Sequence, residues 1–216
     1  MTMDFHFIES IRPYAEEPLT RQIVLQLLKD YRRPNDKIHE LLKRGELLQV
    51  KRGIYIPGPK VPVAQPAGVL LANHLRGPSY VSQETALAHW GLIPERVYEI
   101  SSVTLKSAKS YKTPVGRFSY AHAALPYYAF GIRRVQLTPR QAVLMASPEK
   151  ALCDKIILTS GVILRSVRQA TDFLMEDLRI DEEQLRTLQH SEIHSWIPDA
   201  PKSSSLTMLL KTLEQL

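Results

Sequence analysis

Cysteine is almost absent from this sequence. Its 216 residues contain one cysteine, Cys153, which excludes an internal disulfide and any metal site built from several cysteines. Long apolar runs are also missing, because no stretch approaches the roughly 20 apolar residues of a membrane helix. The first residues, MTMDFHFIES, carry acidic side chains where a leader peptide would be basic. We therefore expect a soluble, cytoplasmic protein with no membrane partner.

Motifs for catalysis and cofactor binding are missing as well. The sequence has no glycine-rich phosphate loop and no nucleophile elbow. His190 and His194 are four residues apart but have no third metal ligand nearby. Cys153 lies on the apolar side of a predicted helix, as a structural thiol does, and Lys150 and Asp154 have the spacing of a surface ion pair on that helix. We expect no catalytic residue, no metal, no cofactor and no enzymatic activity.

Positive charge is present in excess and is unevenly distributed. The net charge of +6 divides into +3 for residues 1–60, +6 for residues 61–146 and −3 for residues 147–216. A basic front and an acidic tail orient a protein towards a polyanion such as a nucleic acid. The apolar share of 44% and the charged share of 23% are those of globular proteins, so we expect a folded chain.

Residues 19–57 combine helical and strand periodicity. Apolar residues recur at helical spacing in two groups, Ile23, Val24, Leu27, Leu28 and Tyr31, then Ile38, Leu41 and Leu42. Gly45 suits the end of the second helix. Two short apolar runs follow, separated by Lys51-Arg52-Gly53, and they indicate a hairpin with a basic tip. Helix, turn, helix and hairpin is the order of a winged helix-turn-helix, whose second helix enters the DNA major groove.

Side chains suited to nucleic acid cluster on this segment. The candidate DNA-binding residues are Arg32, Arg33, Asn35, Lys37, His39, Lys43, Arg44, Lys51 and Arg52. Guanidinium groups match phosphate and the guanine edge, and asparagine matches adenine. We expect base readout near Arg33, Asn35 and Lys37 and a backbone contact from the hairpin. The alternative is that these charges form the solvated side of small helices, because acidic residues are interspersed among them.

A proline-rich linker at residues 57–62 is the predicted domain boundary. It divides the chain into a winged helix-turn-helix domain, residues 1–58, and a larger mixed domain, residues 63–216. In the second domain, period-two segments between residues 97 and 137 predict one antiparallel sheet. Ser82 and Ser147 have the position of helix caps, and the tail has helical stripes of leucine. The predicted fold class is α+β, with C-terminal helices.

Basic residues also lie on the predicted strands of the second domain. They are Lys106, Lys109, Lys112, Arg117, Arg133 and Arg134, with tyrosines interleaved among them. Such a sheet face holds nucleic acid by phosphate contact and stacking. The alternative is ordinary strand composition, since tyrosine favours strands and positive side chains guard sheet edges.

Four stretches of the sequence resemble AbiEi-type antitoxins of type IV toxin–antitoxin systems. They are KRGIYIPG, SYVSQETALAHWGLIPERVYEISSVT, TPVGRFSY and SPEKALCDKI, in the order of that family. The resemblance covers residues 19 to about 174. It implies a winged-helix domain that binds operator DNA and represses its own operon, and a C-terminal domain that counteracts a nucleotidyltransferase-like toxin. By position, the family's DNA contacts fall on the candidate residues named above except His39, and the family supplies no catalytic residues.

Residues and resemblance together predict a DNA-binding transcriptional repressor and antitoxin. Its partners are double-stranded operator DNA and a nucleotidyltransferase-like toxin, with direct contact to the toxin left open. Repressors of this kind bind repeated half-sites, so two copies of a monomer act together on DNA. The alternatives are a solitary regulator without a toxin, a partner-binding antitoxin with a vestigial winged helix, and a nuclease that uses the basic sheet face.

Overall fold

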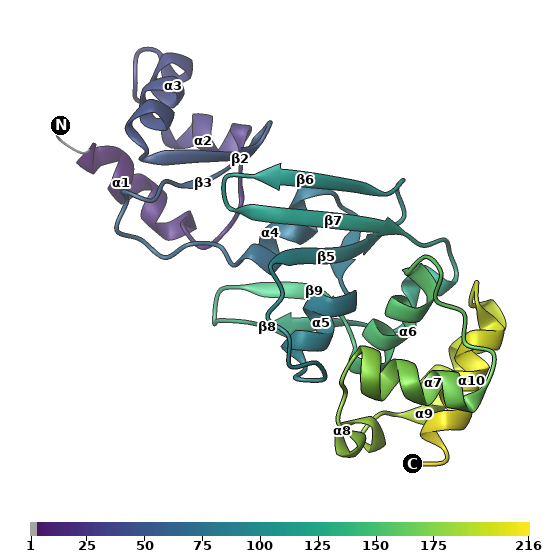
Figure 1. The fold of residues 1–216 in the computed structure, drawn as a ribbon. Coiled ribbons are helices and arrows are strands. Elements are labelled where there is room, and N and C mark those ends of the chain that lie inside the picture. The colour runs from purple at the N-terminus through teal and green to yellow at the C-terminus, as the bar shows by residue number, and fades with distance from the viewer. Residues whose placement is uncertain (1–3) are drawn as a thin grey trace.

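The computed structural model describes residues 4–216 and shows a mixed α+β fold, with two sheets among those residues (Figure 1). The smaller sheet belongs to the N-terminal part of the chain. The larger sheet follows it, and helices occupy the C-terminal part. Within the described residues, no helix has the length and apolar character needed to cross a membrane.

The N-terminal part packs short helices on a three-stranded antiparallel sheet of order β1-β3-β2. Its elements are α1 (Phe5–Ile11), η1 (Arg12–Tyr14), β1 (Leu19–Thr20), α2 (Arg21–Leu27), α3 (Pro34–Arg44), β2 (Leu47–Lys51) and β3 (Ile54–Pro57). The predicted helices and hairpin of this segment are confirmed. Gly45 ends α3 with φ of 72°, a conformation in which glycine has no Cβ to clash.

The rest of the chain builds the larger sheet and the helices around it. In order, these elements are α4 (Gly68–Leu75), β4 (Ser79–Val81), α5 (Gln83–His89), β5 (Glu99–Thr104), β6 (Lys109–Thr113), β7 (Gly116–His122), η2 (Tyr127–Ala129), β8 (Ile132–Gln136), β9 (Ala142–Ala146), α6 (Pro148–Leu158), α7 (Val167–Asp172), the π-helical turn η3 (Phe173–Asp177), α8 (Glu182–Arg186), α9 (His190–Trp196), η4 (Ile197–Asp199) and α10 (Ser203–Leu213).

The large sheet is mixed, so the prediction of an antiparallel sheet is wrong. Its order is β6-β7-β5-β4-β9-β8, and the pairs β5–β7 and β4–β9 are parallel. The β6–β7 hairpin causes the first parallel pair, because β6 takes the outer edge and returns β7 alongside β5. The second involves β9, a strand that sequence patterns did not indicate.

Buried apolar side chains form two clusters, and the β2–β3 hairpin contributes to both. The first cluster spans residues 7–61 and the second includes residues 71–213. Along the hairpin, Leu47 and Tyr55 belong to the first cluster, whereas Val50 and Ile56 belong to the second. Successive residues of a strand point to opposite faces. The hairpin is therefore packed on both faces.

Polar contacts join the two parts of the chain at two places. The Glu16 carboxylate accepts hydrogen bonds from Thr138 Oγ1 and Gln141 Nε2, each at 3.2 Å. On the hairpin, Lys51 Nζ donates to the Leu75 carbonyl oxygen at the end of α4, at 2.8 Å. The first contact fixes the N-terminal part against the turn between β8 and β9, and the second fixes it against α4.

Lys150 and Asp154 are completely buried, so their interpretation as a surface pair is wrong. Lys150 Nζ lies 3.0 Å from Asp154 Oδ1. The carboxylate also accepts hydrogen bonds from Tyr80 Oη at 3.0 Å, Ser82 Oγ at 2.6 Å and Tyr127 Oη at 2.9 Å. Burial lowers the pKa of Lys150, and Asp154 opposes that shift. Helix α6 is buried on most of its surface, so its polar residues Lys150 and Asp154 lie inside the protein instead of on a solvated face.

The two serines expected to cap helices behave differently. Ser147 accepts a hydrogen bond from the Lys150 amide at 3.2 Å and caps α6 as predicted. Ser82 precedes α5 but makes no side-chain cap there, because its hydroxyl donates to Asp154. Cys153 is buried as expected, and burial raises the pKa of its thiol.

Candidate nucleic-acid interface

Helix α3 carries its polar residues on two different faces. Asn35, His39 and Lys43 are exposed and follow one another at intervals of four residues, which places them along one stripe of the helix. Lys37 and Arg44 are largely covered, with side chains 13% and 15% exposed. The apolar residues of α3 face the first core cluster, and they hold the exposed stripe outward.

The exposed stripe borders a groove between α3 and the β2–β3 hairpin. The groove has a volume of about 690 Å³ and is lined by Arg21, Asn35, Ile38, His39, Leu42, Gln49, Arg52, Gly53 and Tyr55. Arg21 Nη2 donates a hydrogen bond to Asn35 Oδ1 at 2.7 Å, which orients the amide of Asn35. The groove thus combines guanidinium, amide and imidazole groups, the side chains that read base edges and phosphates.

Sequence reasoning did not single out Arg21 and Gln49, which line this groove. Arg21 is the first residue of α2 and follows Thr20, whose side chain caps that helix. A basic residue just inside a capped helix was the available signal. Its position opposite Asn35 depends on how α2 packs against α3, and no local pattern reports that.

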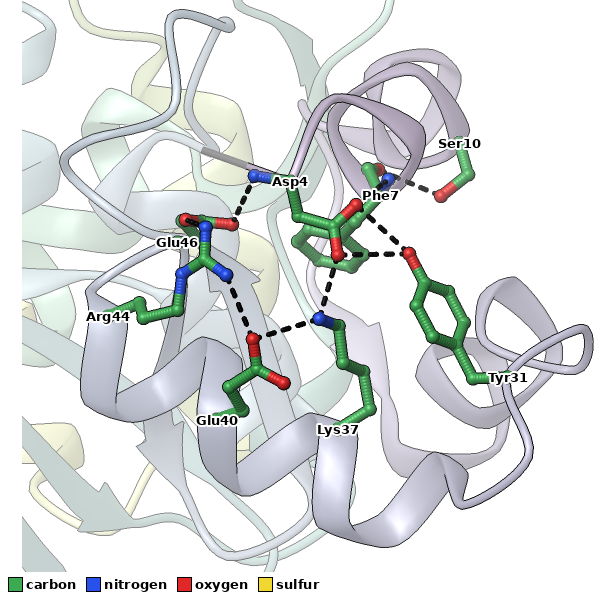
Figure 2. A network of polar contacts seen from close by, with 8 residues as sticks. All are labelled: Asp4, Phe7, Ser10, Tyr31, Lys37, Glu40, Arg44 and Glu46. Atoms are coloured by element: carbon green, nitrogen blue, oxygen red, sulfur yellow. Dashed lines mark hydrogen bonds and ion pairs between the residues drawn. The ribbon is translucent and has the colours of Figure 1, made fainter. Parts of the chain in front are cut away.

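The covered face of α3 carries a network of ion pairs and hydrogen bonds (Figure 2). Lys37 Nζ lies 2.8 Å from Asp4 Oδ2 and 3.0 Å from Glu40 Oε1. Arg44 lies 2.8 Å from Glu40 and 2.6 Å from Glu46. Two of the predicted DNA-binding cations, Lys37 and Arg44, are therefore paired with carboxylates within the protein.

The same network shifts the pKa values of its members. Burial raises the pKa of Asp4, but hydrogen bonds from Lys37, the Phe7 amide and Tyr31 outweigh burial and lower it to about 2. Burial and the hydrogen bond to Asp4 raise the pKa of Tyr31 to about 12. Burial lowers the pKa of Lys37, but its bonds to Asp4 and Glu40 outweigh that effect and raise it. Asp4 thus anchors α1 to α3 by charge.

The remaining candidate residues lie around the groove or in the joint to the large sheet. Arg32, Arg33 and Lys43 are exposed, and Arg33 has a loose contact with Asp36 at 3.8 Å. Arg52 is exposed at the hairpin tip, where it lines the groove. Lys51 is the last residue of β2 and is half-buried, because its ammonium group contacts Leu75 and the ring of Tyr111.

The second predicted basic surface is divided between the two edges of the large sheet. Lys109, Lys112 and Arg117 lie on the β6–β7 hairpin, with Lys106 in the preceding loop. Arg133 and Arg134 lie on β8, at the opposite edge. Arg133 is also within 3.6 Å of Glu149 and 3.7 Å of Glu192. The six residues do not form one continuous surface.

No group of three His, Cys, Asp or Glu side chains within residues 4–216 is placed to hold a metal ion.

No protein-family model matches the chain, and no curated protein matches it. Among solved structures, the chain is similar to the crystal structure of RV2827C protein from Mycobacterium tuberculosis, with a TM-score of 0.65 and 15% sequence identity. That likeness covers 96% of this chain and 76% of the other, and it shows a shared fold.

Proposed function

We propose that this protein is a transcriptional repressor that binds double-stranded operator DNA through the groove between α3 and the hairpin. The observation that carries this proposal is the division of charge on α3. Lys37 and Arg44 are paired with carboxylates on the covered face, whereas Asn35, His39 and Arg52 border the open groove. Groups able to contact DNA therefore gather on one side of the helix.

The arrangement of elements supports a winged helix-turn-helix assignment for the N-terminal part. Helix α3 follows α2 after a short turn and leads into the β2–β3 hairpin. The major groove of B-DNA is wide enough to admit one α-helix, and the 11 residues of α3 extend about 16 Å. In this proposal α3 enters the major groove, and Arg52 contacts the adjacent backbone.

A gel-shift titration on the DNA upstream of the protein's own gene tests this proposal. Random DNA of equal length is the control, and both are titrated at low and at physiological salt. The repressor proposal expects tight binding that survives physiological salt only on the upstream DNA, because base contacts do not depend on counterion release. Equal binding to both DNAs, or none, would contradict it.

We propose in addition that the protein is an antitoxin of a type IV system, autoregulating its operon. The AbiEi-like segments support this role. Two of them meet in the fold, because Tyr80 and Ser82 from one donate to Asp154 from the other. These motifs therefore hold the core, and a toxin-directed activity would lie on the surface of the second part.

Co-expression with a nucleotidyltransferase-like toxin tests the antitoxin role. From a constitutive promoter, wild-type protein and Arg52→Ala should both restore growth, because neutralisation does not require DNA binding in this proposal. If neither protein restores growth, the antitoxin role is contradicted. The protein would then be interpreted as a solitary regulator without a toxin.

A further inference from the structure

Four cationic side chains gather around Tyr111 and the C-terminal end of α4. This group, the Tyr111 cluster, consists of Lys51, Arg76, Lys106 and Lys109. Lys51 and Lys109 place their ammonium groups 4.8 and 5.3 Å from the centroid of the Tyr111 ring. Arg76 Nη1 lies 3.4 Å from the Tyr111 hydroxyl oxygen. The cluster is therefore assembled from the hairpin, the end of α4, the loop before β6 and the edge strand β6 itself.

Carbonyl oxygens offset only part of this charge. Lys51 donates to the Leu75 carbonyl and Lys106 donates to the Gly77 carbonyl at 2.5 Å, and a helix C-terminus carries roughly half a negative charge. Among residues 4–216, no carboxylate lies within 4.0 Å of these four cations. The cluster retains a net positive charge, which favours an anion.

Three further observations agree with an excess of positive charge. Burial raises the pKa of Tyr111, but Arg76 and Lys51 outweigh burial and lower it. The Nε atom of Arg76 is buried and has no hydrogen-bond partner among residues 4–216. Residues 61–146, which supply Arg76, Lys106 and Lys109, hold 9 basic and only 3 acidic residues. The excess of positive charge is therefore a property of residues 61–146 as a whole, and not only of the four side chains of the cluster.

The Tyr111 cluster is continuous with the proposed DNA-reading groove. Lys51 belongs to the cluster, and the next residue, Arg52, lines the groove. The contact between Lys51 and Tyr111 places edge strand β6 directly beside the hairpin, as the ribbon shows (Figure 1). A duplex in the groove that continues past the hairpin tip would next meet this edge.

We propose that the Tyr111 cluster binds the phosphodiester backbone of the same duplex that α3 reads. The surface of the protein that contacts DNA then extends from α3 and the β2–β3 hairpin onto the edge of the large sheet at β6. This inference rests on the proposed function. Contacts to phosphate fix a protein's position on DNA without reading sequence, so the cluster sets the register and orientation of α3 on the operator.

Lys109→Ala tests this inference, with Lys112→Ala as the matched control. Both residues are exposed lysines on β6. Lys109 pairs with Tyr120 and Lys112 pairs with Arg117, and strand alternation places them on opposite faces. Binding is measured by fluorescence anisotropy over a series of salt concentrations, with labelled upstream DNA, random DNA and single-stranded RNA of the same length.

Lys109→Ala should weaken binding to upstream and random DNA alike, by about three- to tenfold, and lower the salt slope by about 1, as the loss of one phosphate contact does. Lys112→Ala should bind like wild type. If wild type binds upstream DNA and Lys109→Ala keeps its affinity and slope, the inference fails and the proposed function stands. If wild type binds no DNA, both fail. Lys109-dependent binding to RNA alone would overturn the DNA assignment.

Discussion

At the scale of single residues, the buried pair of Lys150 and Asp154 has the clearest energetic consequence. Removing one member of a buried ion pair leaves the other charge without compensation, which costs about 3–5 kcal/mol. Asp154→Ala should therefore lower the free energy of unfolding by about that amount, measured by chemical denaturation followed by circular dichroism.

The chain offers a control with the same spacing. Glu182 and Arg186 form an exposed ion pair four residues apart, and exposed pairs contribute about 0–1 kcal/mol. Arg186→Ala should therefore leave the free energy of unfolding nearly unchanged. If Asp154→Ala costs no more than Arg186→Ala, the buried pair does not stabilise the fold in the way its geometry implies.

Asn35 and Arg52 should affect DNA binding in different ways. Asn35 has an oriented amide beside the groove, and a lost base contact costs about 1–3 kcal/mol on the matching site alone. Asn35→Ala should weaken binding to upstream DNA and leave binding to random DNA unchanged. Arg52→Ala should weaken both, since a backbone contact carries no sequence information. Anisotropy titrations on both DNAs separate the two patterns, and equal loss on random DNA for Asn35→Ala would place the reading residue elsewhere.

At the scale of elements, the pairing of α1 with α3 through Asp4 predicts a pH dependence. The pKa of Asp4 is about 2 in the folded protein, below its ordinary value of 3.8. A carboxyl group with a depressed pKa stabilises the fold above its ordinary pKa, and that contribution disappears as the pH falls towards the folded value. Asp4 should thus contribute about 2 kcal/mol at neutral pH, and this should be lost between about pH 4 and pH 2.

Unfolding measured from pH 2 to neutral pH for wild type and Asp4→Asn tests this expectation. The difference between the two proteins should be largest at neutral pH and should vanish near pH 2. Asp36→Asn is the control, because its carboxylate is 71% exposed and lies 3.8 Å from Arg33. A constant difference between wild type and Asp4→Asn across the range would show that charge on Asp4 does not stabilise the helix pair.

Sequence patterns predicted the amphipathic helices well and the sheet less well. Helices α2, α3 and α6 bury one face or begin at a recognisable cap. Both features depend on residues only a few positions apart, so the sequence pattern reports them. Strand β9, AVLMA, consists largely of residues that also favour helices, and it lies inside the large sheet, where both neighbours are strands. Its pairing with β4 joins residues far apart in the sequence, so no local period reveals the parallel pair.

The candidate site was predictable in composition but not in geometry. The sequence indicated that basic residues cluster near α3, and Asn35, His39 and Arg52 do line one groove. It could not show that Lys37 pairs with Asp4, because the two residues are separated by 33 positions in the sequence and their contact depends on how α1 packs. The sequence also indicated that Lys51 lies at the hairpin tip. It could not show that the ammonium group of Lys51 is directed at α4, because that contact too depends on how distant segments pack.

At the scale of the whole molecule, the hairpin that enters both cores predicts cooperative unfolding. Both tryptophans, Trp90 and Trp196, pack with the second cluster, whereas Leu41 is buried in the first. Replacing a buried leucine by alanine costs about 2–5 kcal/mol. Leu41→Ala should therefore destabilise both parts of the chain by the same free energy. The loss should be the same whether unfolding is followed by tryptophan fluorescence, which reports the second cluster, or by hydrogen exchange in α1 to α3, which reports the first. An unchanged fluorescence transition would show that the two parts unfold independently.

The double-sided packing of the hairpin also limits how freely this architecture can be recombined. A transplant of residues 1–58 onto another scaffold would carry away Leu48, Ile54 and Ile56 without the side chains that cover them. An uncovered apolar strand face invites association with other chains. A change of DNA specificity is therefore more accessible by substitution within the groove than by exchange of the whole N-terminal unit, and chimeras of this protein require a host that supplies a matching apolar surface.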